Sequence, residues 1–154
     1  MKIFFYTIFL VFSTTLLSHA QSFPSNKQSL EPNPWTQAQL IQPSELAALI
    51  ANPNAQKSLI FNIGVVDNIQ GAQNIGGVSE KENLEKFKKV LTSLPKNTFL
   101  VVYCGCCPFD KCPNIRPAYS LLKSMGFSNG RLLNLPVNLK QNWIDKGYPL
   151  MPKK

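Results

Sequence analysis

The stretch FLVVYCGCCPFDKCPNIRPAYSLL, residues 99–122, holds the strongest strand pattern of the chain, all four of its cysteines and the start of a helix pattern. The apolar run 99–103 leads directly to Cys104, and an amphipathic pattern opens at Ile115. In parallel α/β sheets, ligands and reactive groups gather beyond the carboxyl ends of the strands. We therefore expect Cys104 to lie at such a strand end, close to the start of a helix.

The sequence on either side of this stretch alternates between strand and helix patterns. Strands are predicted at 59–66, 72–75, 98–103 and 131–135, and helices at 43–51, 84–94, 115–125 and 139–146. Ser79 and Glu82 have the spacing of a capping box before the second helix. The alternation predicts an α/β fold, a single domain with a mostly parallel central sheet flanked by helices.

The amino-terminal residues, 1–20, have the pattern of a secretory signal peptide. Lys2 precedes an almost wholly apolar run, 3–17, and small residues around Ala20 suit a cleavage site. This run is shorter than the roughly 20 residues of a membrane-spanning helix. We expect a periplasmic or secreted protein with no stable membrane insertion after signal cleavage.

The mature chain is expected to have three parts. Residues 21–34 are polar and proline-rich and predict a flexible leader. Residues 35–150 form the predicted domain, and 151–154 a short basic tail.

Composition excludes several chemistries. His19 is the only histidine and lies in the predicted signal peptide, so the mature chain lacks the imidazole of Ser-His-Asp or Cys-His sites. Loss of Lys2 leaves 15 basic and 8 acidic residues, a net charge of +7. The basic residues are dispersed without interleaved aromatics, so no nucleic-acid partner is expected.

The four cysteines are poor candidates for purely structural disulfides. Cys104, Cys106, Cys107 and Cys112 would close very short loops, which give little entropic stabilisation. Cys104 is expected at a strand end. Cys112 precedes a helix start, where the helix dipole lowers a thiol pKa. Lys111 and Arg116 would act in the same direction, so both cysteines are predicted to be thiolates.

Several segments together resemble the rhodanese-like sulfurtransferase domain. These are LIFNIG at 59–64, NIQGAQNIG at 68–76, VVYC at 101–104, LLKSMGF at 121–127 and NWIDKGYP at 142–149. The resemblance covers roughly residues 36–149. In that family, the first core strand carries an acidic residue and an arginine, where this chain has Asn62 and Gly64.

The resemblance implies that Cys104 carries a sulfane sulfur as a persulfide, taken from a small sulfur-containing anion such as thiosulfate and passed to a thiol or other thiophilic acceptor. Cys112 is a candidate second thiol for sulfur transfer or thiol redox chemistry: it could resolve a persulfide on Cys104 as a disulfide, or itself be the main nucleophile. Arg116 loosely matches the basic residue that closes the family's loop. The expected substrate-binding loop consists of Gly105, Cys106, Cys107, Lys111 and Asn114. Gly105 would let the backbone approach a ligand closely.

Other chemistries remain open for the same loop. The four thiolates could bind zinc or copper, although no cofactor is expected for sulfur transfer. Cys104 and Cys107 have the Cys-x-x-Cys spacing of thiol oxidoreductases. A cysteine phosphatase would need five residues between nucleophile and arginine, whereas eleven residues lie between Cys104 and Arg116 and three between Cys112 and Arg116.

Overall fold

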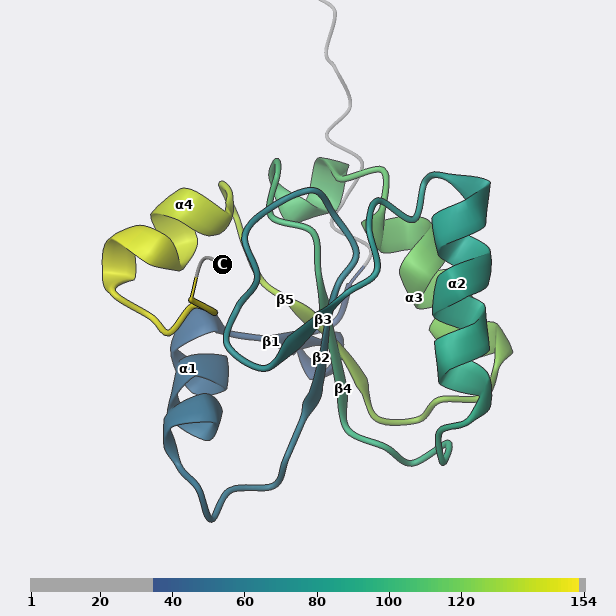
Figure 1. Ribbon diagram of the computed structural model, residues 1–154, viewed down its shortest axis with the longest axis horizontal. Coiled ribbons are helices and arrows are strands. Elements are labelled where there is room, and N and C mark those ends of the chain that lie inside the picture. The colour runs from purple at the N-terminus through teal and green to yellow at the C-terminus, as the bar shows by residue number, and fades with distance from the viewer. Residues whose placement is uncertain (1–34, 153–154) are drawn as a thin grey trace, which may run out of the picture. The chain divides into compact units, whose positions relative to one another are not determined.

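The computed structural model describes residues 35–152, which form a three-layer α/β fold around one sheet (Figure 1). All pairings between the five strands are parallel, in the order β1-β5-β4-β2-β3. The strands are β1 (Leu40–Ile41), β2 (Leu59–Asn62), β3 (Ala72–Asn74), β4 (Leu100–Tyr103) and β5 (Gly130–Leu133). The predicted fold class is confirmed, while the expected signal peptide and leader lie outside the described residues.

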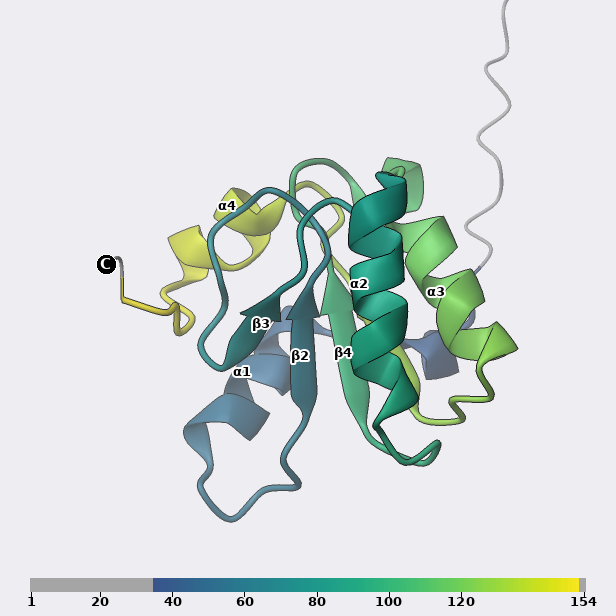
Figure 2. The same ribbon diagram turned by 45° about the vertical axis from the view of Figure 1, so that its right-hand side comes forward.

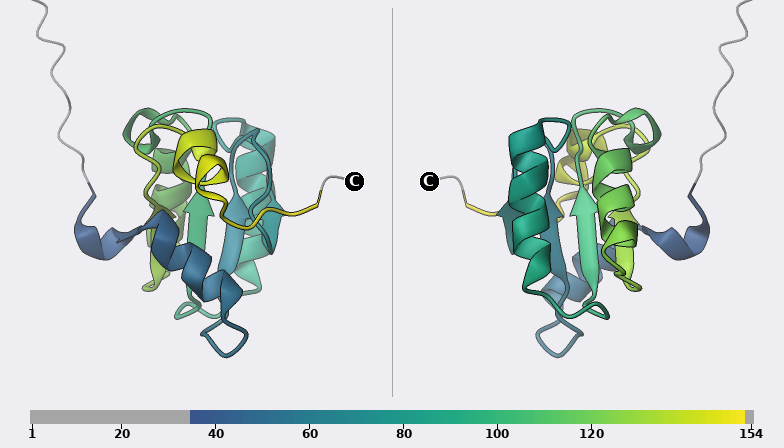
Figure 3. Two further views of the ribbon diagram at one scale, coloured as in Figure 1. Left: turned by 90° about the vertical axis from the view of Figure 1, so that its left-hand side faces the viewer. Right: turned by 90° about the vertical axis from the view of Figure 1, so that its right-hand side faces the viewer.

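Helices cover both faces of the sheet. They are α1 (Pro43–Ala51), α2 (Lys81–Thr92), α3 (Ile115–Ser124) and α4 (Leu139–Asn142), with short 3-10 turns η1 (Gln37–Gln39), η2 (Phe109–Lys111) and η3 (Ile144–Lys146). Side chains of α2 and α3 pack in the core on one face, and those of α1 and α4 on the other. Figure 3 shows the two pairs from opposite sides, and Figure 2 shows α2 and α3 next to each other.

The alternating side chains of β4 build both cores. Leu100 and Val102 face α2 and α3, whereas Val101 and Tyr103 face α1 and α4. Because β4 lies between β5 and β2, all four of these side chains are completely buried. Cys104 continues the first face directly after the carboxyl end of β4. Strands β2, β3 and β4 all point to this edge of the sheet (Figure 2).

Two local predictions are wrong. Strand β2 ends at Asn62 rather than at residue 66, because the Asn62 side chain turns the chain: its Oδ1 accepts from Gly64 N at 3.0 Å, and its Nδ2 donates to Val66 O at 2.8 Å. The Ser79 capping box does not form. Helix α2 begins after Glu80, and the backbone N–H of Ser79 donates to Asn114 Oδ1 instead.

Replacing Tyr103 by phenylalanine is expected to lower the free energy of unfolding by about 1–2 kcal/mol. The buried Tyr103 hydroxyl accepts from Ile69 N at 2.9 Å and donates to Asp67 O at 3.2 Å, so the change leaves a buried N–H without its partner. Urea denaturation measures the loss. Tyr119→Phe is the control, because its hydroxyl makes no hydrogen bond within residues 35–152. Equal losses in both variants would contradict this account.

Candidate functional site

Cys104 lies directly after β4 and is 1% exposed. The strand end is held by the bond from Ile63 N to Tyr103 O, at 2.9 Å. Gly64 then passes so close that a Cβ there would lie 2.8 Å from both Cys104 O and Cys104 Sγ. Absence of a side chain at Gly64 is therefore what makes room for the sulfur.

Polar groups lie close to the Cys104 sulfur. Asn114 Nδ2 donates to it at 3.2 Å, the Cys106 sulfur lies at 3.3 Å, and the Cys112 sulfur lies within 4.8 Å. Hydrogen bonding with the Cys112 side chain is the largest influence on the Cys104 pKa, which falls to about 5 although burial opposes the charge. This low pKa favours the thiolate form of Cys104 at neutral pH.

Asn114 has its orientation fixed by two contacts. Its Oδ1 accepts from the backbone N–H of Ser79 at 2.8 Å, which leaves Nδ2 to face Cys104. Asn114 is 6% exposed, and its side chain links the segment just before α2 to the residue just after β4. A buried amide held in this way is a preorganised donor to a charged sulfur.

The prediction that Cys112 is also a thiolate is wrong. Cys112 is 2% exposed, and its pKa is raised far above the usual range, chiefly because its thiol donates to Cys104 and also because it is buried. Neighbouring sulfurs in one buried site share a single favourable negative charge, and the additional donors place it on Cys104. Tertiary hydrogen bonding thus overrides the helix-start effect on which the prediction relied.

Cys106 is the exposed member of the cluster, and Cys107 is half-buried. Partial desolvation of the sulfur and hydrogen bonding with Cys104 raise the pKa of Cys106 to about 12. Its sulfur also lies 3.5 Å from that of Cys107. Cys106 and Gly105 line an open groove of about 410 Å³, together with residues of α4 and the loop after β2.

Gly105 has a positive φ of 82°, which favours glycine. The group packed against Gly105 is the Leu139 side chain, because a Cβ at Gly105 would lie 2.8 Å from Leu139 Cβ. The bond from Leu139 N to Gly105 O, at 2.9 Å, fixes this approach. Helix α4 therefore occupies the position beside Gly105 where a close contact with a ligand was expected.

The two predicted cations lie at the edge of the site. Lys111 is exposed on η2, and the Arg116 guanidinium lies over the Trp35 ring, 5.9 Å from its centroid. Within residues 35–152, no hydrogen bond joins either side chain to a cysteine sulfur, and neither contributes to the pKa shifts of Cys104 and Cys112.

Three of the four sulfurs are close enough to hold one metal ion. The sulfurs of Cys104, Cys106 and Cys112 all lie within 4.8 Å of one another, whereas Cys107 is not part of this group. Three thiolates suit a soft ion such as Cu(I), while a closed zinc site would require a fourth ligand.

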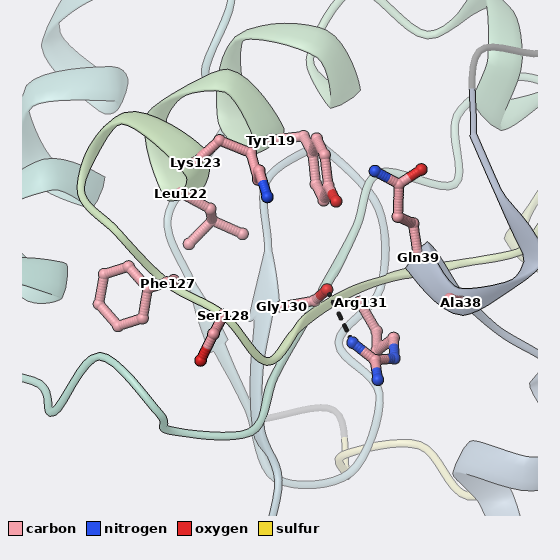
Figure 4. A pocket seen from close by; sticks show the side chains of 9 residues that line it. All are labelled: Ala38, Gln39, Tyr119, Leu122, Lys123, Phe127, Ser128, Gly130 and Arg131. Carbon is pink, nitrogen blue, oxygen red and sulfur yellow. Dashed lines mark hydrogen bonds between the residues drawn. The ribbon is translucent and has the colours of Figure 1, made fainter.

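A different cavity, of about 250 Å³, lies near the amino-terminal end of β5, away from the cysteines (Figure 4). Lys123 and Arg131 contribute its positive charge, and Arg131 donates to Gly130 O at 3.4 Å. No cysteine lines it. The cysteine cluster therefore lies outside this cavity.

The sequence pattern predicts the position of Cys104 at a strand end, but not the residues that shape its surroundings. Gly64 and Asn62 were recognised only as departures from the family pattern, and Ser79 only as a helix cap. Asn114 is expected in the substrate-binding loop, and the structure places its side-chain amide against the Cys104 sulfur. Gly64, which stands where the family carries a charged residue, was the available signal, because a glycine at such a position indicates that another part of the chain approaches its backbone closely.

Replacing Cys112 by alanine is expected to raise the Cys104 pKa from about 5 toward the ordinary thiol value, because the largest stabilising hydrogen bond is lost. Cys112→Ser keeps a hydroxyl donor and should retain much of the depression. A pH titration of thiolate ultraviolet absorbance, with Cys104→Ser subtracted, measures both. The signal of the wild type should disappear only as the pH falls through about 5. Identical titrations of the alanine variant and the wild type would contradict the assigned hydrogen bond.

Comparison with known proteins supports the fold. No protein-family model matches the chain, and no curated protein sequence matches it. Among solved structures, it is similar to the single-domain sulfurtransferase RDL2 of Saccharomyces cerevisiae, with a TM-score of 0.50 and 20% identity over 73% of this chain and 95% of that chain. The chain thus has the rhodanese-like fold that the sequence resemblance predicted.

Proposed function

We propose that this rhodanese-like domain is a sulfurtransferase that carries a sulfane sulfur as a persulfide on Cys104. The observation that supports the proposal most strongly is the set of donors around the Cys104 sulfur at the end of the central strand. A thiolate is the nucleophilic form of cysteine. The pKa of Cys104 is lowered, whereas those of Cys106 and Cys112 are raised.

The proposed reaction has two displacement steps. With thiosulfate as donor, the Cys104 thiolate attacks the outer sulfur, the S–S bond of thiosulfate breaks, and sulfite leaves with the electron pair. A thiophilic acceptor then attacks the outer sulfur of the persulfide, and Cys104 leaves as a thiolate. Asn114 and Cys112 stabilise that thiolate at the start and the end of the cycle, and the net positive charge of the chain favours small sulfur-containing anions as donors.

Mass spectrometry after thiosulfate treatment tests the proposal. Trypsin cuts after Lys96 and Lys111, so the peptide 97–111 contains Cys104 but lacks Cys112. It should gain one sulfur atom in the wild type and in Cys107→Ser, but not in Cys104→Ser. No gain on any cysteine would refute the proposal.

Metal binding is a second candidate function, favoured by the proximity of three sulfurs. Cys104, Cys106 and Cys112 would bind one Cu(I) ion as thiolates, which requires the two protonated thiols to lose their protons on binding. Anaerobic titration with Cu(I) against a competing chelator should give one ion per chain in the wild type and in Cys107→Ser. If Cys106→Ser and Cys112→Ser bound Cu(I) as tightly as the wild type, this site would be excluded.

We also propose that the protein acts outside the cytoplasm, after removal of residues 1–20. Within residues 35–152, no helix is long and apolar enough to cross a membrane. Amino-terminal sequencing of the protein from its native compartment should begin at Gln21. Retention of Met1, or recovery of the protein only from the cytoplasm, would contradict export.

A further inference from the structure

The sulfurs of Cys104 and Cys106 lie 3.3 Å apart, closer than the 3.5 Å between those of Cys106 and Cys107. A disulfide is about 2.05 Å long, so the sulfurs must approach by little more than 1 Å. Gly105 stands between them with its positive φ, and this bend turns the Cys106 side chain back toward Cys104. Cys106 and Cys107 are also close, but they are adjacent in the chain, where a disulfide strains the intervening peptide.

The two sulfurs differ sharply in access. Cys104 is 1% exposed, whereas Cys106 is exposed and lines the open groove beside α4. Cys112, whose sulfur lies within 4.8 Å of that of Cys104, is 2% exposed. A thiol arriving from solvent therefore meets the exposed Cys106 before either buried sulfur.

We infer that Cys104 and Cys106 form a redox-active disulfide, and that a thiol substrate attacks this disulfide at Cys106. This activity goes beyond sulfur transfer and needs no sulfane sulfur. It also assigns the second redox thiol to Cys106 rather than to Cys112.

Reduction of the disulfide by a dithiol substrate takes two steps, and reoxidation completes the cycle. The substrate thiolate attacks Cys106 Sγ, a substrate–Cys106 disulfide forms, the bond to Cys104 breaks, and Cys104 leaves as a thiolate. The second thiol of a dithiol substrate then attacks the substrate sulfur, which releases Cys106 as a thiolate that takes up a proton. The substrate ends as a disulfide and the site as a dithiol, and a small-molecule disulfide such as oxidised glutathione restores the Cys104–Cys106 bond.

The surroundings of Cys104 favour this direction of cleavage. In thiol–disulfide exchange, the sulfur that is better stabilised as a thiolate leaves faster. Asn114 Nδ2 already donates to Cys104 Sγ at 3.2 Å. The same donor stabilises the reduced pair, which makes the disulfide oxidising toward substrate thiols.

Peptide mapping in glutathione redox buffers tests the pairing with no sulfur donor present. Reduced protein is equilibrated with mixtures of reduced and oxidised glutathione, quenched with acid, alkylated and cut with trypsin. Cleavage after Lys96, Lys111 and Lys123, but not between Arg116 and Pro117, gives peptides 97–111 and 112–123. A Cys104–Cys106 disulfide makes 97–111 lighter by two hydrogens with one alkylated cysteine, whereas a bond from Cys104 to Cys112 links the two peptides.

Cys107→Ser is the matched control, since it keeps both proposed partners and should form the disulfide within 97–111 as the wild type does. Cys106→Ser should lower the oxidised fraction of that peptide at least about tenfold. A linked pair of peptides, no disulfide in any buffer, or undiminished oxidation of Cys106→Ser would each overturn the pairing.

Rapid quenching locates the attacked sulfur. Oxidised Cys107→Ser protein is mixed with excess reduced glutathione, stopped with acid within the first turnover, and fragmented in the mass spectrometer. The glutathione adduct should lie on Cys106, with Cys104 alkylated. An adduct mainly on Cys104 would overturn the assignment of Cys106 as the entry point.

Discussion

Replacing Cys104 by serine is expected to lower sulfur transfer from thiosulfate to cyanide by about a thousandfold or more. The serine hydroxyl stays protonated at neutral pH and cannot form a persulfide. The donors that now stabilise the Cys104 thiolate, Asn114 and Cys112, would face a neutral oxygen. Steady-state production of thiocyanate measures the loss.

Cys107→Ser is the control for this prediction. Cys107 lies in the same loop, but its sulfur is outside the group formed by Cys104, Cys106 and Cys112. Its activity should stay within a few fold of the wild type, and circular dichroism should show that both variants are folded. A folded Cys104→Ser protein with more than a tenth of the wild-type rate would contradict the assignment of Cys104 as the sulfur carrier.

Replacing Gly64 by alanine is expected to lower the free energy of unfolding by about 3 kcal/mol and to disturb the site. The new Cβ would lie 2.8 Å from Cys104 O and Sγ, and 3.1 Å from Cys104 Cα. Two of these atoms are backbone, and the bond from Ile63 N to Tyr103 O holds the strands together beside them. The clash therefore has to be relieved by displacing Cys104 from its donors. Urea denaturation and the thiolate absorbance titration measure the two consequences, and the Cys104 pKa should rise.

Gly77→Ala is the matched control. A Cβ at Gly77 has Asn114 Oδ1 as its nearest neighbour, at 3.4 Å, and its φ is not in the left-handed region. This change lies near the same cluster but should cost less than about 1 kcal/mol and leave the Cys104 pKa low. Equal behaviour of the two variants would show that the contact between Gly64 and Cys104 does not limit the site.

The fold was predictable because its signals are local and repeated. The apolar run that becomes β4 and the amphipathic spacing of α2 and α3 each follow from residues close in sequence. Strand ends were less predictable. Strand β2 ends where the Asn62 side chain bonds to the following backbone, and apolar residues continue beyond that point.

The position of the site was predictable from the sequence, but which cysteine sulfur carries the negative charge was not. The strand end located Cys104, whereas the donors that hold it come from tertiary contacts. Asn114 is fixed by Ser79, 35 residues earlier in the chain, and reaches Cys104 across ten residues. A helix start is a local feature, so it suggested a thiolate at Cys112. Which of two neighbouring sulfurs carries the charge depends on all of the donors around both.

A burst of sulfite tests the central claim most directly. When thiosulfate is mixed with reduced protein in the absence of an acceptor, the formation of a Cys104 persulfide releases one sulfite per chain and then stops. Rapid-quench measurement should show a burst of about one equivalent in the wild type and in Cys107→Ser, and none in Cys104→Ser. A wild-type protein that is fully reduced and folded but releases no sulfite, or a burst that persists in Cys104→Ser, would contradict sulfur transfer through Cys104.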